Sequence, residues 1–148
     1  MSKTITFKGQ IPMGLQDHIR LKTLKGKTGY RIKKFSIISS TPGVGNVEFV
    51  AKVTSTKDLN VGPTVDFTDG DIMAVSYLKE RANDFYGHGL GPIIFDTEIV
   101  NQDIFVSIDD AAGGTVPCNY YLELETITLS DIQATELTLK ALRNVASR

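Results

Sequence analysis

The sequence predicts a mainly β protein: an antiparallel β-sandwich, of jelly-roll or another sandwich topology, followed by one C-terminal α-helix. Short segments in which apolar and polar residues alternate recur along the chain, and this period of two is typical of strands that bury one face. Turn residues separate these segments, and no alternation of strands with long helices appears, which disfavours a parallel α/β sheet. The chain of 148 residues has no linker-like stretch, so a single domain over 1–148 is expected.

The clearest change of pattern lies in the C-terminal part of the chain. Residues 119–125 alternate as a strand does, and residues 130–147 then place apolar side chains at helical spacing. Ser130 and Gln133 have the form of a capping box, which marks the start of a helix. We expect this helix to close an open end of the sandwich, or to pack on a neighbouring subunit, through its leucines: Leu137, Leu139 and Leu142.

The N-terminal residues 1–15 are expected to be an arm or a fraying terminus. They hold a short strand-like run at 4–7, which Gly9, Pro12 and Gly14 interrupt. An arm of this kind would reach a neighbouring copy in an assembly.

The strands between the two ends follow from the same alternation. They are expected at these ranges: 18–22, 30–38, 47–54, 72–78, 93–100 and 103–108. Strands 18–22 and 30–38 should form one hairpin, and strands 93–100 and 103–108 a second, through Asn101 and Gln102. A short helix is the alternative for 72–78, because both of its faces are apolar. Residues 55–70 read as a long connection with a brief strand at 64–67.

Charge is divided unevenly along the chain, although the net charge is only −1. The residues through Lys34 hold nine bases and one acid, or +8, and the remainder carries −9. The basic side chains of the expected first hairpin are Arg20, Lys22, Lys25, Lys27, Arg31, Lys33 and Lys34. They predict either a solvated strand face or a contact with packaged nucleic acid or an acidic neighbour, in another copy or in the same one.

No residue pattern points to catalysis, so we expect no enzyme activity and no cofactor. His18 and His88 have no nucleophile motif around them, and Cys118, the single cysteine, reads as a buried thiol. Asp66, Asp69 and Asp71 lack the order of a calcium-binding loop and read as an acidic turn. No apolar run approaches the roughly 20 residues needed to cross a bilayer, so no membrane contact is expected.

A resemblance adds to this interpretation. Residues 92–106, the strand 118–125 and the helical residues Ala134, Thr135 and 139–143 resemble short uncharacterised proteins encoded in marine bacteriophage genomes. The looser likeness extends to 30–38. No catalytic motif lies inside these segments, so the resemblance implies a phage origin and no active-site residue.

A phage origin implies a virion structural protein, either a capsid shell subunit or a head decoration protein. Its partners would be copies of itself and other virion proteins, and its location the virion, after synthesis in the host cytoplasm. The alternative is a tail or receptor-binding module that recognises a host-surface glycan. Its contact residues would lie in loops at one end of the sandwich: Tyr77, Phe85, Tyr86 and His88.

Overall fold

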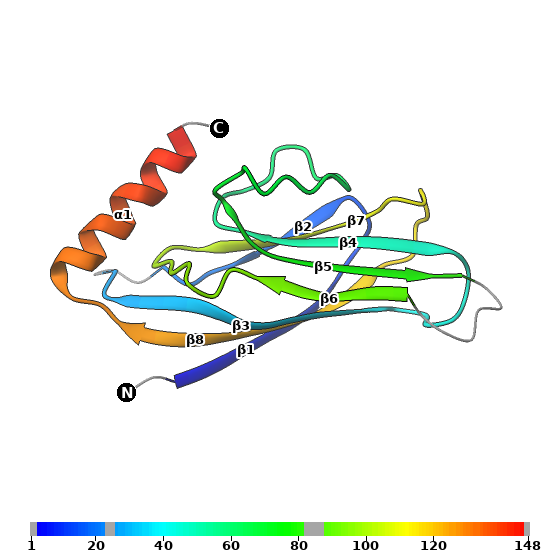
Figure 1. Cartoon of the computed structure of the whole chain (residues 1–148), viewed down its shortest axis with the longest axis horizontal. Helices are drawn as coiled ribbons and strands as arrows, with labels where there is room; N and C mark the ends of the chain where they lie inside the picture. The colour runs from blue at the N-terminus through cyan, green and yellow to red at the C-terminus, as the bar shows by residue number, and fades with distance from the viewer. Residues whose placement is uncertain (1–2, 23–25, 82–87, 147–148) are drawn as a thin grey trace.

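The computed structural model describes residues 3–22, 26–81 and 88–146. Two antiparallel sheets face each other, and one helix lies across an end of the sandwich (Figure 1). The elements are β1 (Lys3–Ile11), β2 (Leu15–Ile19), β3 (Thr28–Ser39), β4 (Val47–Thr54), β5 (Ile72–Glu80), β6 (His88–Ile94), β7 (Ile104–Asp110), β8 (Cys118–Thr128) and α1 (Asp131–Ala146). The predicted antiparallel β-sandwich with a C-terminal helix is therefore confirmed.

The strand order places β8 at the centre of one sheet and β4 at the centre of the other. The three-stranded sheet has the order β1–β8–β3, and the five-stranded sheet the order β2–β7–β4–β5–β6. The core lies between them and takes large, fully buried side chains from both: Ile32, Phe35, Leu122, Leu124, Phe49, Val53, Ile104, Val106 and Ile108. Except for Ile32 and Phe35, these residues occupy alternate positions of their strands, as a one-sided sheet requires.

β1 corrects the prediction that residues 1–15 form an arm. It pairs with β8 along its whole length, from Lys3 opposite Thr126 to the buried Ile11 opposite Cys118. Gly9 does not break the strand, because the ring of Tyr120 lies over it and a Cβ there would be 2.9 Å from Cε1 of that ring. The glycine makes room for the aromatic side chain, so the strand passes through it without interruption.

Both predicted hairpins are wrong, because the chain crosses between strands that are not neighbours. β2 belongs to the five-stranded sheet and β3 to the three-stranded sheet, while β4 and β5 separate β6 from β7. After β6 the chain instead reaches β3: the Tyr30 amide donates to the Val100 carbonyl at 2.7 Å, and the Val100 amide donates back at 3.0 Å. The predicted strand 93–100 therefore stops at Ile94, where β6 ends.

A β-bulge in β3 explains the irregular pattern of that strand. The pairing with β8 shifts between Ile32 and Lys34, which leaves Lys33 as the extra residue. In a regular strand every second residue points inward. Ile32 and Phe35 nevertheless both point into the core with two residues between them. The bulge takes up this slip and keeps both lysines on the surface.

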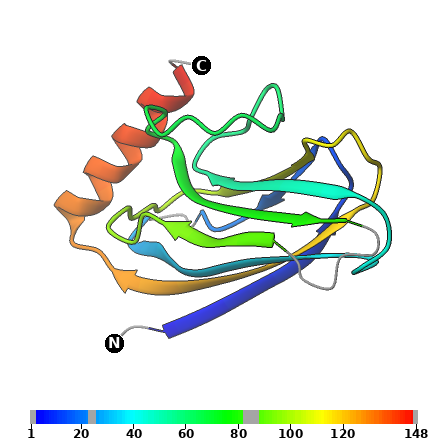
Figure 2. The ribbon, with the colours of Figure 1, turned by 45° about the vertical axis from the view of Figure 1, so that its right-hand side comes forward.

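The segment between β4 and β5 packs over the outer face of these two strands, beside α1 (Figures 1 and 2). Beneath it Lys52, only 7% exposed, donates from Nζ to the Thr64 carbonyl at 2.9 Å and lies 3.8 Å from the Asp58 carboxylate. The Phe67 ring meets Phe95 edge to face at 5.2 Å. This cover explains why β5, predicted as a strand, is apolar on both faces; the brief strand expected at 64–67 is absent.

Candidate functional site

Helix α1 begins with the predicted capping box. The Gln133 amide donates to Ser130 Oγ at 3.2 Å, and the Ser130 amide donates to Gln133 Oε1 at 3.0 Å. These reciprocal bonds satisfy two backbone donors that the first helical turn leaves without a partner. The Asp131 carboxylate, 2.9 Å from Lys27 Nζ, adds an acidic side chain to that turn and ties it to the chain before β3.

The helix packs on the sandwich through Ala134 and Leu137, and three other large aliphatic residues are exposed. Ala134 is buried and Leu137 half-buried, while Ile132, Leu139 and Leu142 are 73%, 47% and 62% exposed. Ile132, Leu139 and Leu142, here called the outer α1 stripe, lie seven and three residues apart and so share one side of the helix. Of the two alternatives expected for the leucines, closing the end of the sandwich fits only Leu137, because Leu139 and Leu142 stay largely exposed. Packing of these two on a neighbouring subunit stays a prediction.

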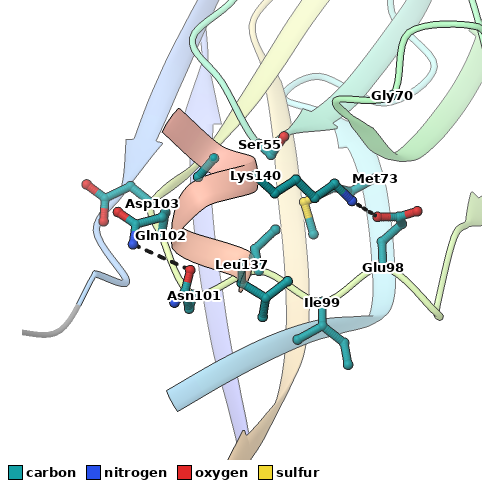
Figure 3. A pocket seen from close by; sticks show the side chains of 12 residues that line it. Ser55, Gly70, Met73, Glu98, Ile99, Asn101, Gln102, Asp103, Leu137 and Lys140 are labelled. Atoms are coloured by element: carbon teal, nitrogen blue, oxygen red, sulfur yellow. Dashed lines mark hydrogen bonds and ion pairs between the residues drawn. The ribbon is translucent and has the colours of Figure 1, made fainter. Parts of the chain in front are cut away.

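Asn101 lies beside α1 (Figure 3) and fixes its position by hydrogen bonds to the helix. Its side chain is 1% exposed, and its Nδ2 donates to the carbonyls of Gly26 and Ala134 at 3.0 and 3.1 Å and to Thr138 Oγ1 at 3.0 Å. The same amide thus joins the chain before β3, the chain before β7 and the helix. A pocket of only about 30 Å³ remains beside it, large enough for one or two water molecules.

A larger groove of about 430 Å³ runs between α1, the segment after β4 and the start of β7. The side chains of Leu142, Leu59 and Phe105 provide its apolar lining, and Lys22 and Lys57 its cationic groups. Leu59 is 69% exposed, so two leucines from segments far apart in sequence present open aliphatic surface at the same place. Such a surface is suited to an apolar side chain of another protein.

Asp103 holds the chain at the end of β2 beside this groove. Its Oδ1 accepts from the backbone amides of Leu21 and Lys22 at 2.8 and 2.7 Å, and its Oδ2 lies 2.7 Å from His18 Nε2. Partial burial opposes ionisation of Asp103, but the hydrogen bonds from Lys22, His18 and Leu21 outweigh it, so the pKa lies below the ordinary value. The His18 ring stacks on Phe105, with centroids 4.7 Å apart. The arrangement is a structural clamp.

The basic residues of the predicted first hairpin do not form one cationic face. The Arg31 guanidinium donates from Nε and Nη2 to Glu125 at 3.2 and 2.7 Å, Lys33 lies 3.8 Å from the same carboxylate, and Lys27 pairs with Asp131. Lys34 lies over the ring of Tyr121, 5.8 Å from its centroid. The exposed Arg20 and Lys22 lie on the crossing from β2 to β3, and Lys25 is outside the described residues. Three of these seven basic residues, Lys27, Arg31 and Lys33, therefore have acidic partners within one copy.

A second apolar hollow lies on the outer face of the three-stranded sheet. It has a volume of about 530 Å³, and Ile37, Ile38 and the two tyrosines Tyr120 and Tyr121 line it. Ile38 is 54% exposed and Tyr121 37% exposed. The sequence analysis did not select these residues: the alternation of β8 places Tyr121 outward, whereas Ile38 is outward only because the bulge at Lys33 shifts the phase of β3.

The acidic turn and the cysteine have structural roles. Asp66 Oδ1 accepts from the amide and the hydroxyl of Thr68, and Asp71, only 7% exposed, accepts from the hydroxyl of Thr56. In the part of the chain that the structure describes, no cluster of three His, Cys, Asp or Glu side chains could hold a metal ion. Cys118 is buried, as predicted, and burial raises the pKa of its thiol to about 12.

The residues expected to contact a glycan are only partly described. The Tyr77 hydroxyl donates to Glu48 at 2.7 Å, whereas Phe85, Tyr86 and the side chain of His88 lie outside the described residues. The glycan-binding alternative stays a prediction.

Comparisons with known proteins leave the resemblance to phage proteins as a prediction. No protein-family model matches the chain, and a search of curated proteins finds no match. Among the helical residues described, no helix is both long and apolar enough to span a bilayer.

Proposed function

We propose that this chain is a structural subunit of a phage virion, a capsid shell subunit or a head decoration protein, that acts by packing against copies of itself and other virion proteins. The observation that supports the proposal best is the outer α1 stripe. Ile132, Leu139 and Leu142 present aliphatic surface on an element that is already docked through its opposite side. Contiguous apolar surface of this kind marks a contact with another protein.

The strand pairing supports a jelly-roll topology. In a jelly roll of eight strands the first pairs with the eighth, the second with the seventh, the third with the sixth and the fourth with the fifth. Pairs β1–β8, β2–β7 and β4–β5 are present here, whereas β6 pairs with β5, and only the chain after β6 meets β3, at the bridge between Tyr30 and Val100. Jelly rolls are common in viral capsids, although the same fold also serves lectins and cupins.

In this proposal the protein is made in the host cytoplasm and becomes part of the virion. Contact with packaged nucleic acid is the secondary expectation. It would depend on Arg20, Lys22 and Lys34, because Lys27, Arg31 and Lys33 have acidic partners within the chain.

The oligomeric state of the purified protein tests the role of the outer α1 stripe. Sedimentation equilibrium of the unmodified chain should show self-association, and the double variant Leu139→Gln/Leu142→Gln should weaken it at least tenfold. Glu136→Gln is a matched control, because it changes an exposed residue of the same helix without removing aliphatic surface. A chain that stays monomeric at about 0.1 mM, or equal association of all three proteins, would contradict the proposal.

The virion assignment needs a separate measurement. Mass spectrometry of purified particles of the phage that encodes the chain should detect it in many copies per particle. Its absence from those particles would remove the virion assignment, whatever the oligomeric state.

A further inference from the structure

The outer edge of β1 is a long strand edge that can accept another strand. The Lys3 amide donates to Thr126 Oγ1 on β8, so the odd-numbered residues of β1 direct their backbone groups toward β8. The even-numbered residues Thr4, Thr6, Lys8 and Gln10 therefore direct their amides and carbonyls away from the sheet. β1 forms the lower margin of the sandwich in both views, with no described segment beyond it (Figures 1 and 2).

The opposite edge of the same sheet confirms this assignment of alternate backbone groups. Tyr30 and Phe35 are residues of β3 whose backbone groups point away from β8. They belong to the same alternating set once the extra residue of the bulge is counted. The Tyr30 amide donates to the Val100 carbonyl, and the Phe35 carbonyl accepts from the Ser76 hydroxyl at 2.9 Å. Both bonds point away from β8, as the alternation requires.

The other three edge strands are protected from pairing, and no described segment covers β1 in the same way. Edge β3 is bridged at Tyr30 and Phe35, as just described. Edge β6 contains Pro92, which has no amide hydrogen to donate. Edge β2 has only five residues, and the side chain of Gln16 binds the backbone of Asp58 through both its amide and its oxygen. Proteins cover or interrupt their strand edges in these ways to prevent unwanted pairing, so an unprotected edge of nine residues is a candidate interface.

We propose that β1 of one copy pairs antiparallel with β1 of a second copy about a twofold axis at Thr6, so that the two three-stranded sheets become one sheet of six strands. This inference rests on the proposed function, since it names one surface through which copies associate. In this register Thr6 faces Thr6 of the second copy, Thr4 faces Lys8, and Ile5 faces Phe7. The outward backbone groups of Thr4, Thr6 and Lys8 would form about six hydrogen bonds across the axis.

The side chains fit this register on both faces of the sheet. The lysines do not oppose each other, because Lys8 meets Thr4 and Lys3 meets Gly9, so like charges are kept apart. Ile5 and Phe7, which are only partly buried in one copy, would lie side by side on the inner face. The β-branched residues at 4–6 favour an extended strand. A register shifted by two residues, with its axis at Phe7, would instead place Lys8 opposite Thr6 and two phenylalanines on the axis.

Disulfide cross-linking tests both the pairing and its register. Thr6→Cys should form a covalent dimer under mild oxidation, because directly opposed residues of a hydrogen-bonded pair have Cα atoms about 5.5 Å apart, within disulfide range. Thr4→Cys is the matched control: its two copies would be about 13 Å apart along the strands and should not cross-link. A mixture of Thr4→Cys and Lys8→Cys chains should cross-link as a heterodimer. Cys118 is buried and should not take part.

A second variant tests pairing without a cross-link. Thr6→Pro removes an amide that points away from β8, so the fold should survive and far-UV circular dichroism should stay unchanged, while β1 pairing is lost. Sedimentation equilibrium should then show a dimer affinity at least tenfold lower than that of the unmodified chain.

The outcomes separate this inference from the proposed function. Cross-linking of Thr6→Cys and of the mixture, without cross-linking of Thr4→Cys, supports the register. Equal cross-linking of Thr6→Cys and Thr4→Cys, or association that Thr6→Pro leaves unchanged, would overturn β1 pairing while self-assembly through α1 stands. A monomeric unmodified chain that yields no Thr6→Cys dimer would overturn both.

Discussion

Replacing Asn101 by alanine should detach α1 from the sandwich more effectively than any other single change. Its buried Nδ2 has three oxygen acceptors within 3.1 Å but only two hydrogens to donate, so it makes the equivalent of two full bonds. Two of these acceptors, Ala134 and Thr138, belong to the helix. Alanine would remove both donors and leave a cavity beside the pocket under α1.

The expected cost follows from the buried position of these bonds. Each buried hydrogen bond that loses one partner costs about 1–3 kcal/mol, so Asn101→Ala should lower the free energy of unfolding by about 2–4 kcal/mol. For a domain of this size that corresponds to a fall in Tm of roughly 5–15 °C. Part of the loss should appear as local opening of the helix rather than as global unfolding.

Urea denaturation followed by far-UV circular dichroism measures the global change, and hydrogen exchange over 131–143 measures the local one. Gln102→Ala is the matched control, because Gln102 is the next residue, lines the same pocket and has one long bond of 3.4 Å to Asn101. Its effect should stay below about 1 kcal/mol. If Asn101→Ala cost no more than this control and left exchange in α1 unchanged, Asn101 would not be the residue that anchors the helix.

Three further predictions concern other buried groups. Asp58→Ala should lower the free energy of unfolding by about 1–3 kcal/mol in urea titrations, because it leaves the Lys52 ammonium under the loop with one carbonyl partner, whereas Lys52→Met should cost less. Because the pKa of Asp103 is lowered in the folded chain, its contribution to stability is present above the ordinary value of 3.8 and is lost as pH falls below it. Asp103→Asn should therefore reduce the loss of stability at acid pH, measured by circular dichroism. An unchanged acid dependence would contradict the clamp. Cys118 should react with a thiol reagent at pH 8 only after unfolding, and fast reaction of the native chain would contradict its burial.

The sequence was sufficient for the fold class and for most strand positions, because one-sided burial leaves a period of two. It was also sufficient for the start of the helix, where Ser130 and Gln133 form the capping bonds that their spacing predicts. These features are local: each depends on residues within one turn or one strand. β5 was identified as a strand for the same reason. Nothing local in the sequence showed that the segment between β4 and β5 covers its outer face.

The errors concern choices between distant partners. Residues 18–22 and 30–38 are consecutive strands with a turn between them, yet they enter different sheets, and alternation contains no information about the sheet that a strand joins. Gly9 reads as an interruption until the ring of Tyr120, more than a hundred residues later, is seen to require the space above it. The outward leucines of α1 were expected to be buried because helical spacing identifies an apolar stripe but not the surface that covers it.

The position of β8 between β1 and β3 has a consequence for synthesis. The Lys3 amide and its partner Thr126 are separated by 123 residues, so the three-stranded sheet cannot close until the ribosome has released nearly all of the described chain. Pairing over so long a separation slows folding, since the loop-closure entropy must be overcome before the contacts form. During that interval β1 and β3 have no central strand to join them, and a nascent chain in this state would be a substrate for the host chaperones.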